Sequence, residues 1–121
     1  MQKIRTLIVD DHAFFRKTLR AYIAGIGDAD IVGEAANGKE AVGLAVDLHP
    51  QLIIMDINMP EMDGIRACEV IKQKNAGIKV VLYTMSDPKT YGTDGRTMAD
   101  MCLSKDRLYE EMPGVLKGFR T

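Results

Sequence analysis

The sequence lacks three features, each of which would point to a particular class of protein. Its formal net charge at pH 7 is only −1, so it has no basic excess of the kind that nucleic-acid-binding domains use to neutralise phosphates. No apolar run approaches the roughly 20 residues that a membrane-spanning helix needs. The residues after Met1 lead straight into an apolar strand, without the features of a signal peptide. Direct nucleic-acid binding and membrane insertion are therefore not expected.

Cysteine is also scarce. The two cysteines, Cys68 and Cys102, lie in apolar surroundings and do not have the spacing of metal ligands. This usage indicates two small core residues in a reduced, cytoplasmic protein, although the sequence alone leaves a disulfide open. The hydrophobic fraction is 46% and the charged fraction 27%. These values and the length predict one domain, residues 1–121, that buries its own core.

Short apolar runs alternate with longer amphipathic ones along the whole chain. Strands are predicted at Ile4–Val9, Ile31–Ala35, Leu52–Met55, Val80–Tyr83 and Met101–Leu103. The third and fourth runs are apolar throughout, which is typical of parallel strands covered on both faces. The alternation predicts an α/β fold, a doubly wound parallel sheet with right-handed crossovers and helices on both faces.

Apolar residues at helical spacing predict the segments between the strands. A stripe from Phe15 to Ile26 marks the first helix, the capping box Asn37–Glu40 opens the second, and the third runs from about Ile65 to Lys74. The fourth, Asp87–Met98, contains two glycines that each cost about 1 kcal/mol in a helix interior, so it should be short or weak. Pro113-Gly114 should interrupt the fifth helix, which would begin as one loose turn and restart at Pro113.

Polar residues stand where the predicted strands end. They are Asp10 and Asp11 after the first strand, Asp56 after the third, Thr84 at the end of the fourth and Lys105 after the fifth. Ligands of such sheets bind at the carboxyl ends of the strands, so these residues should share one rim. Each has a simpler explanation alone; Asp11, for example, could cap the first helix. The combination is what indicates a site.

Three carboxylates on one rim need a counter-charge. Two like charges about 4 Å apart repel by roughly 4 kcal/mol at an effective dielectric near 20, so a cation, a proton or a lysine must join them. A hard divalent ion such as Mg²⁺ answers that need. The same site suits phosphoryl transfer, in which one carboxylate attacks phosphorus and Lys105 offers a point charge to a phosphoryl oxygen.

Four segments resemble, in order, the signatures of the response-regulator receiver domains of two-component signalling. These are Leu7–His12, Met55–Gly64, Leu82–Thr84 and Leu103–Lys105. The resemblance spans nearly the whole chain and implies the flavodoxin-like (βα)5 fold with strand order 2-1-3-4-5. The Asp-Asp-His start and the Ser-Lys-Asp end are most similar to receivers of the NarL/FixJ group, which commonly precede a helix-turn-helix output domain.

The resemblance also implies a role for each carboxylate. Asp56 would accept a phosphoryl group from a sensor histidine kinase or a phosphotransfer protein. Mg²⁺ would be bound directly by Asp11, chiefly through water by Asp10, and also by Asp56 and the backbone carbonyl of Asn58.

Two further residues would contact the phosphoryl group, Thr84 through its hydroxyl and Lys105 through its ammonium. The signal would act on the face formed by the fourth helix, the fifth strand and the fifth helix. An output domain or effector protein would read it there, with a homodimer on phosphorylation as a further option. Many receivers carry an aromatic residue where this chain has Cys102, so a threonine–aromatic switch would need Tyr83 or Tyr91 instead.

Three other functions fit the residues less well. An aspartyl-phosphate hydrolase usually needs a second Asp two residues after its nucleophile, where this chain has Asn58. An FMN carrier needs a phosphate loop after the first strand, where this chain has two carboxylates. The intact acidic set argues against a receiver that is only an interaction module. The prediction is a signalling domain that catalyses its own phosphorylation and dephosphorylation, not an enzyme.

Overall fold

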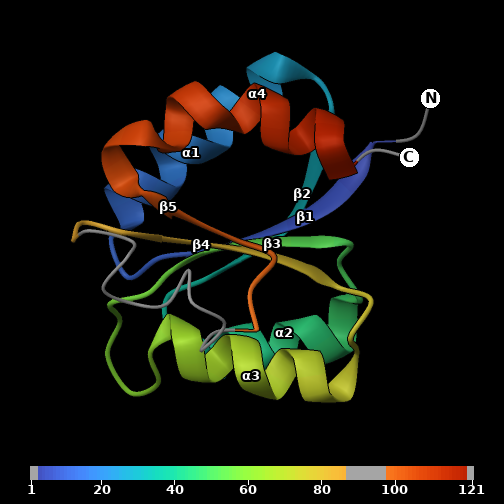
Figure 1. Cartoon of the computed structure of the whole chain (residues 1–121), viewed down its shortest axis with the longest axis vertical. Coiled ribbons are helices and arrows are strands. Elements are labelled where there is room, and N and C mark those ends of the chain that lie inside the picture. Colours follow the sequence, from blue (N-terminus) through green and yellow to red (C-terminus); the bar gives the residue numbers. More distant parts are fainter. Residues whose placement is uncertain (1–2, 87–97, 120–121) are drawn as a thin grey trace.

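A single parallel sheet forms the centre of the molecule. The computed structural model describes residues 3–86 and 98–119. Within them, five strands lie in the order β2-β1-β3-β4-β5 (Figure 1). Their bounds are β1 (Ile4–Val9), β2 (Ala29–Ala35), β3 (Leu52–Asp56), β4 (Lys79–Thr84) and β5 (Met101–Ser104). The predicted order and parallel pairing are confirmed, and every strand begins and ends within two residues of its prediction.

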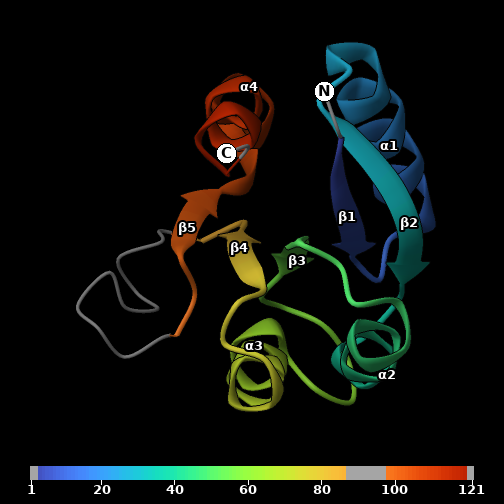
Figure 2. The same cartoon turned by 90° about the vertical axis from the view of Figure 1, so that its right-hand side faces the viewer.

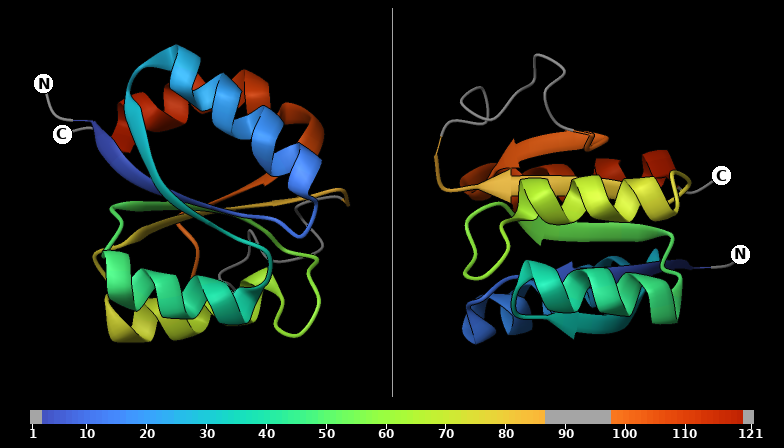
Figure 3. Two further views of the ribbon diagram at one scale, coloured as in Figure 1. Left: turned by 180° about the vertical axis from the view of Figure 1, so that it is seen from behind. Right: turned by 90° about the horizontal axis from the view of Figure 1, so that it is seen from below.

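Helices cover both faces of the sheet. The helices are α1 (Ala13–Ile26), α2 (Gly38–Leu48), α3 (Gly64–Lys74) and α4 (Leu108–Phe119), the last preceded by the 3-10 turn η2 (Lys105–Arg107). Figures 1 and 2 show α1 and α4 on one face and α2 and α3 on the other. Seen from below in Figure 3, α2 and α3 lie side by side across the strands. This is the doubly wound arrangement that the alternation of strands and helices predicts.

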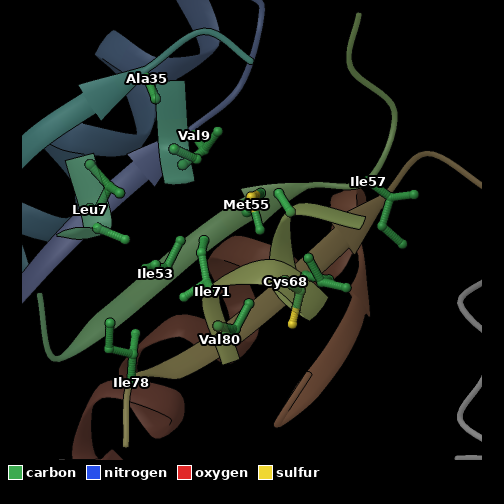
Figure 4. Packing of buried hydrophobic residues seen from close by; sticks show 14 residues of the cluster. Leu7, Val9, Ala35, Ile53, Met55, Ile57, Cys68, Ile71, Ile78 and Val80 are labelled. Atoms are coloured by element: carbon green, nitrogen blue, oxygen red, sulfur yellow. The ribbon is translucent and has the colours of Figure 1, made fainter. Parts of the chain in front are cut away.

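The sheet divides the apolar core in two. Neighbouring residues of one strand point to opposite faces, so Ile53 and Met55 pack toward α2 and α3 (Figure 4), whereas Leu52 and Ile54 pack toward α1 and α4. All five residues of β3 are buried. Burial on both faces explains why this run is apolar throughout, without the alternation of a half-exposed strand.

The start of α2 confirms the predicted capping box. The Asn37 side chain accepts a hydrogen bond from the Glu40 amide at 2.9 Å, and the Glu40 carboxylate accepts one from the Ala36 amide at 3.4 Å. The first bond satisfies a backbone donor that a helix start otherwise leaves unpaired, and the second ties the Glu40 side chain back to the residue before the cap. The helix therefore begins where the sequence places it.

The prediction that Pro113 interrupts the last helix is wrong. Helix α4 runs from Leu108 to Phe119 with Pro113 inside it. Proline has no amide hydrogen for the carbonyl four residues earlier, which belongs to Tyr109. The hydroxyl of Tyr22, on α1, donates to that carbonyl at 2.7 Å, and the two tyrosine rings meet edge to face. A contact between helices thus replaces the missing bond and lets α4 continue.

The segment that enters β5 is fastened by a carboxylate. Asp100 accepts hydrogen bonds from the Lys72 ammonium of α3 at 2.7 Å and from the Val80 amide of β4 at 2.8 Å. Residues 87–97, which include nearly all of the predicted fourth helix and Tyr91, lie outside the described residues. No helix of the described part is long and apolar enough to cross a membrane. Cys68 and Cys102 are both free thiols.

Candidate functional site

The predicted rim residues come together where the parallel strands end. These strand ends lie at the left edge of the sheet in Figure 1. Asp10 follows β1, and Asp56 is the last residue of β3. Asp10, Asp11, His12 and Asp56 each offer one ligand atom, and these atoms all lie within 4.8 Å of one another. Thr84 ends β4, and Lys105 follows β5. The cluster is an acidic pocket that could hold a metal ion.

Asp10 forms the buried wall of this pocket. Its residue is 0% exposed, and both carboxylate oxygens already have partners. Oδ1 accepts from the His12 amide at 2.8 Å and lies 3.1 Å from His12 Nδ1. Oδ2 accepts from the Tyr83 hydroxyl at 2.6 Å and lies 3.5 Å from Lys105 Nζ. An ion would therefore meet Asp10 through water or by displacing one of these donors.

Asp11 and Asp56 each bring a carboxylate oxygen to the pocket, and these oxygens lie within 4.8 Å of each other. Helix α1 begins at Ala13 with His12 as its N-cap, so Asp11 is not needed to cap the helix. The Asp11 side chain is 31% exposed, whereas the Asp56 residue as a whole is buried. Burial, followed by the nearby Asp10 charge, raises the pKa of Asp56 to about 6, although the Asn58 amide and Lys105 oppose this rise. A cation in the pocket would lower that pKa again, because it favours the charged carboxylate.

Lys105 lies against Asp10 and over an aromatic ring. Its ammonium is 4.1 Å from the centre of the Phe15 ring, and its side chain is 15% exposed. Ammonium groups are attracted to ring faces at this distance. The stem and head of the lysine are thus held inside the pocket, close to the carboxylates.

Thr84 is connected to Asp56 through Asn58. The Asn58 backbone amide donates to Asp56 Oδ1 at 3.2 Å, and the Asn58 side-chain nitrogen, Nδ2, donates to Thr84 Oγ1 at 3.3 Å. Thr84 is fully buried, and its hydroxyl oxygen also accepts from the Ser86 amide at 3.1 Å. The loop after β3 and the end of β4 are therefore joined at the pocket. Met85, the residue after Thr84, is 77% exposed.

The geometry agrees with the similarity to known proteins. A family model described as the response regulator receiver domain matches residues 6–115. The chain belongs to this receiver family. Its domain is thus a module of two-component signalling, and the resemblance inferred from the sequence is confirmed.

Two curated relatives illustrate the similarity of the receiver to longer proteins. One is a protein-glutamate methylesterase/protein-glutamine glutaminase from Methanosarcina mazei, 56% identical over 67% of this chain and 22% of the relative. Another is the response regulator protein VraR from Staphylococcus aureus, 41% identical over 73% of this chain and 43% of the relative. The matched part of the chain thus spans less than half of either relative.

Solved structures share the fold over nearly all of the chain. The signal receiver domain of the putative response regulator NarL from Mycobacterium tuberculosis has a TM-score of 0.88 at 26% identity, covering 98% of both chains. The CheB response regulator domain of Thermotoga maritima has a TM-score of 0.80 at 31% identity, covering 98% and 95%. A CheX–CheY–BeF3–Mg²⁺ complex from Borrelia burgdorferi has a TM-score of 0.82 at 26% identity, covering 98% and 90%. The predicted likeness to NarL-type receivers is confirmed.

Two residues of the receiver have roles in the pocket that the sequence pattern does not predict. Phe15 lies beneath Lys105, and the Tyr83 hydroxyl bonds Asp10. The pattern assigns Phe15 only to an apolar helix stripe. It offers Tyr83 as a substitute switch residue and not as a partner of Asp10. A buried tyrosine hydroxyl needs a hydrogen-bond partner, so the place of Tyr83 beside Thr84 is the signal that could have found this contact.

Gly64 holds the loop after Asp56 close to the strand. Its amide donates to the Ile57 carbonyl at 2.8 Å, and a Cβ on Gly64 would collide with the Asp56 carbonyl oxygen. Gly64→Ala should therefore lower the free energy of unfolding by about 1–2 kcal/mol, as overpacking does. Urea denaturation measures this change. Gly43→Ala on α2 is the matched control, since a Cβ there meets open space and should stabilise the helix by roughly 0.5–1 kcal/mol. Equal stability of Gly64→Ala and the unmodified receiver would contradict the clash.

Proposed function

We propose that this receiver is a Mg²⁺-dependent phosphoacceptor and that Asp56 takes the phosphoryl group. The observation that carries the proposal is the convergence of Asp10, Asp11 and Asp56 within 4.8 Å, with the Lys105 ammonium 3.5 Å from Asp10. Like charges gathered this closely raise the free energy of the fold unless a cation joins them. A structural role alone gives no reason to collect them.

The donor set suits Mg²⁺. Three of the four clustered side chains are carboxylates, and hard divalent ions prefer oxygen ligands and keep several waters. In the proposed site, Asp11 and Asp56 would bind the ion directly, Asp10 would bind it chiefly through water, and the Asn58 carbonyl would complete the protein ligands. Bound there, Mg²⁺ supplies positive charge for the phosphoryl oxygens. Mg²⁺ is also present in the Borrelia complex to which this receiver is similar.

The remaining groups of the chain would act on the phosphoryl group. A carboxylate oxygen of Asp56 attacks phosphorus and a phosphorus–oxygen bond forms. The phosphorus–nitrogen bond to the donor's histidine breaks, and its electron pair stays on the nitrogen, which takes up a proton from water to give neutral imidazole. Lys105 turns from Asp10 toward a phosphoryl oxygen, and the Thr84 hydroxyl donates to another. The product is an aspartyl phosphate, which water hydrolyses to the Asp56 carboxylate and inorganic phosphate.

The partners follow from this chemistry. The donor would be a cytoplasmic sensor histidine kinase or a phosphotransfer protein. We propose that residues 1–121 form one receiver domain that signals through segment 87–98, β5 and α4 to an output domain or effector protein, with a phosphorylation-dependent homodimer as one form of this response. In this role the receiver is a signalling domain that transfers and releases its own phosphoryl group.

A small phosphodonor tests the proposal. Incubation with acetyl phosphate and Mg²⁺, followed by intact-protein mass spectrometry, should show one phosphoryl adduct. The adduct should be absent with EDTA in place of Mg²⁺ and absent in Asp56→Asn. Asp47→Asn, which changes an exposed carboxylate on α2, is the matched control and should keep the adduct. Persistence of the adduct in Asp56→Asn would sink the assignment.

A further inference from the structure

Tyr83 connects the end of β4 to the acidic pocket. Its residue is 0% exposed. Its hydroxyl donates to Asp10 Oδ2 at 2.6 Å and lies 3.4 Å from the Val9 carbonyl oxygen. The first distance is that of a strong hydrogen bond from a hydroxyl to a carboxylate. A side chain 73 residues away in sequence thus holds one oxygen of a candidate metal ligand.

The backbone and the ring of Tyr83 are both fixed. Tyr83 pairs with Asp56 in the sheet, and its carbonyl accepts from the Ile57 amide at 2.9 Å. Its ring packs against Phe15 with centroids 5.6 Å apart. A buried ring held by these contacts keeps its hydroxyl in one place. The bond to Asp10 is therefore a built part of the pocket.

The hydroxyl shares Asp10 Oδ2 with a cation. Lys105 Nζ is 3.5 Å from the same oxygen. Tyr83 donates a hydrogen bond without adding charge, whereas an ammonium close to Asp10 repels an incoming divalent ion. If the hydroxyl were removed, the Asp10 carboxylate would form a closer ion pair with Lys105. Its side chain could also rotate, because one of its hydrogen bonds would be lost. Both effects weaken the binding of a cation.

We propose that Tyr83 is a positioning residue for the divalent ion, because its hydroxyl orients the Asp10 carboxylate and weakens the ion pair between Lys105 and Asp10. This inference rests on the metal-binding part of the proposed function. Hydrogen-bond partners of metal ligands typically change metal affinity by about 10- to 100-fold when they are removed. Tyr83 acts through Asp10 and has no need to touch the ion.

Calorimetric titration with Mg²⁺ tests this role. Tyr83→Phe should bind Mg²⁺ about 10-fold more weakly than the unmodified receiver. Tyr22→Phe is the matched control: it also removes a hydroxyl bond, but to a backbone carbonyl of α4, and should leave the Mg²⁺ affinity unchanged. In an Asp10→Asn background the effect of Tyr83→Phe should vanish, because residues acting through one contact are not additive. An unchanged affinity in Tyr83→Phe, or the same loss in both backgrounds, would overturn the inference.

The unmodified receiver offers a second measurement, useful should Tyr83→Phe fold poorly. The sequence has no tryptophan and four tyrosines, so Mg²⁺ binding beside Asp10 should perturb the near-ultraviolet tyrosine absorbance. A silent spectrum at saturating Mg²⁺, or no Mg²⁺ binding at all, overturns the inference. The acetyl phosphate assay separates the two proposals. If Tyr83→Phe binds Mg²⁺ more weakly but the unmodified receiver forms no adduct, this inference stands and phosphoacceptance is refuted. If the unmodified receiver forms the adduct but Tyr83→Phe binds Mg²⁺ with unchanged affinity, phosphoacceptance stands and this inference is refuted.

Discussion

Asp56→Asn should stabilise the receiver against unfolding by about 3 kcal/mol near pH 7.5 when divalent ions are absent. Burial and the Asp10 charge raise the pKa of Asp56 to about 6, above the roughly 3.9 of an unfolded aspartate. The folded state therefore holds the Asp56 proton more tightly than the unfolded state. Above about pH 6 the charged carboxylate lowers stability by its full amount, and asparagine removes that charge.

The pH dependence gives this prediction its sign. As pH falls from about 6 toward 4, Asp56 takes up its proton in the folded state, and the advantage of asparagine should shrink toward zero. Urea denaturation in EDTA between about pH 5 and 8 measures the difference. The exposed Asp47→Asn change should have little effect at any pH. Added Mg²⁺ should reduce the advantage, because the ion offsets the repulsion in the unmodified pocket. An Asp56→Asn receiver less stable than the unmodified one at pH 7.5 would show that burial and the Asp10 charge do not destabilise the Asp56 carboxylate.

Lys105→Met should change two properties of the pocket in opposite directions. The ammonium, 3.5 Å from Asp10, competes electrostatically with a divalent ion, so its removal should tighten Mg²⁺ binding by about 10-fold. The same ammonium is the group proposed to meet the phosphoryl oxygens. Loss of one such contact typically slows a reaction by about 100-fold or more, and phosphorylation by acetyl phosphate at saturating Mg²⁺ should slow accordingly.

Methionine is the replacement of choice for Lys105 because it keeps an unbranched apolar stem beside Phe15. Calorimetry gives the Mg²⁺ affinity, and the rate of adduct formation by mass spectrometry gives the transfer step. Lys117→Met removes an exposed lysine from α4 and should alter neither quantity. A fall in both affinity and rate for Lys105→Met would show that the lysine supports the pocket structurally instead of competing with the ion.

The strands could be predicted from the sequence because a strand that is buried on both faces has to be a continuous apolar run. Ile53 and Met55 face one half of the core and Leu52 and Ile54 the other, so the run has to be apolar whatever its neighbours are. The start of α2 could be predicted from a different local feature. The Asn37 side chain accepts a hydrogen bond from the backbone amide of Glu40, only three residues later. A contact this close in sequence can be predicted from a short motif.

The last helix shows where local reasoning fails. Pro113 removes a backbone bond, and within the segment itself nothing replaces it. The replacement comes from Tyr22, 87 residues earlier than the carbonyl that it satisfies. A helix that packs against the sheet and against α1 can keep a proline when a neighbouring side chain takes the free carbonyl.

By itself, the sequence determined the alternation of elements, the parallel sheet and the rim on which three aspartates, a threonine and a lysine meet. Parallel strands must bring their carboxyl ends to one edge, so the order of elements sufficed. Only the tertiary structure decided that the Tyr83 hydroxyl bonds Asp10 and that the Lys105 ammonium lies over the Phe15 ring. It also decided that burial, together with the Asp10 charge, raises the pKa of Asp56 to about 6. These contacts depend on how helices and strands pack across the sheet. That packing is determined by contacts between residues far apart in the chain, which a local sequence pattern does not show.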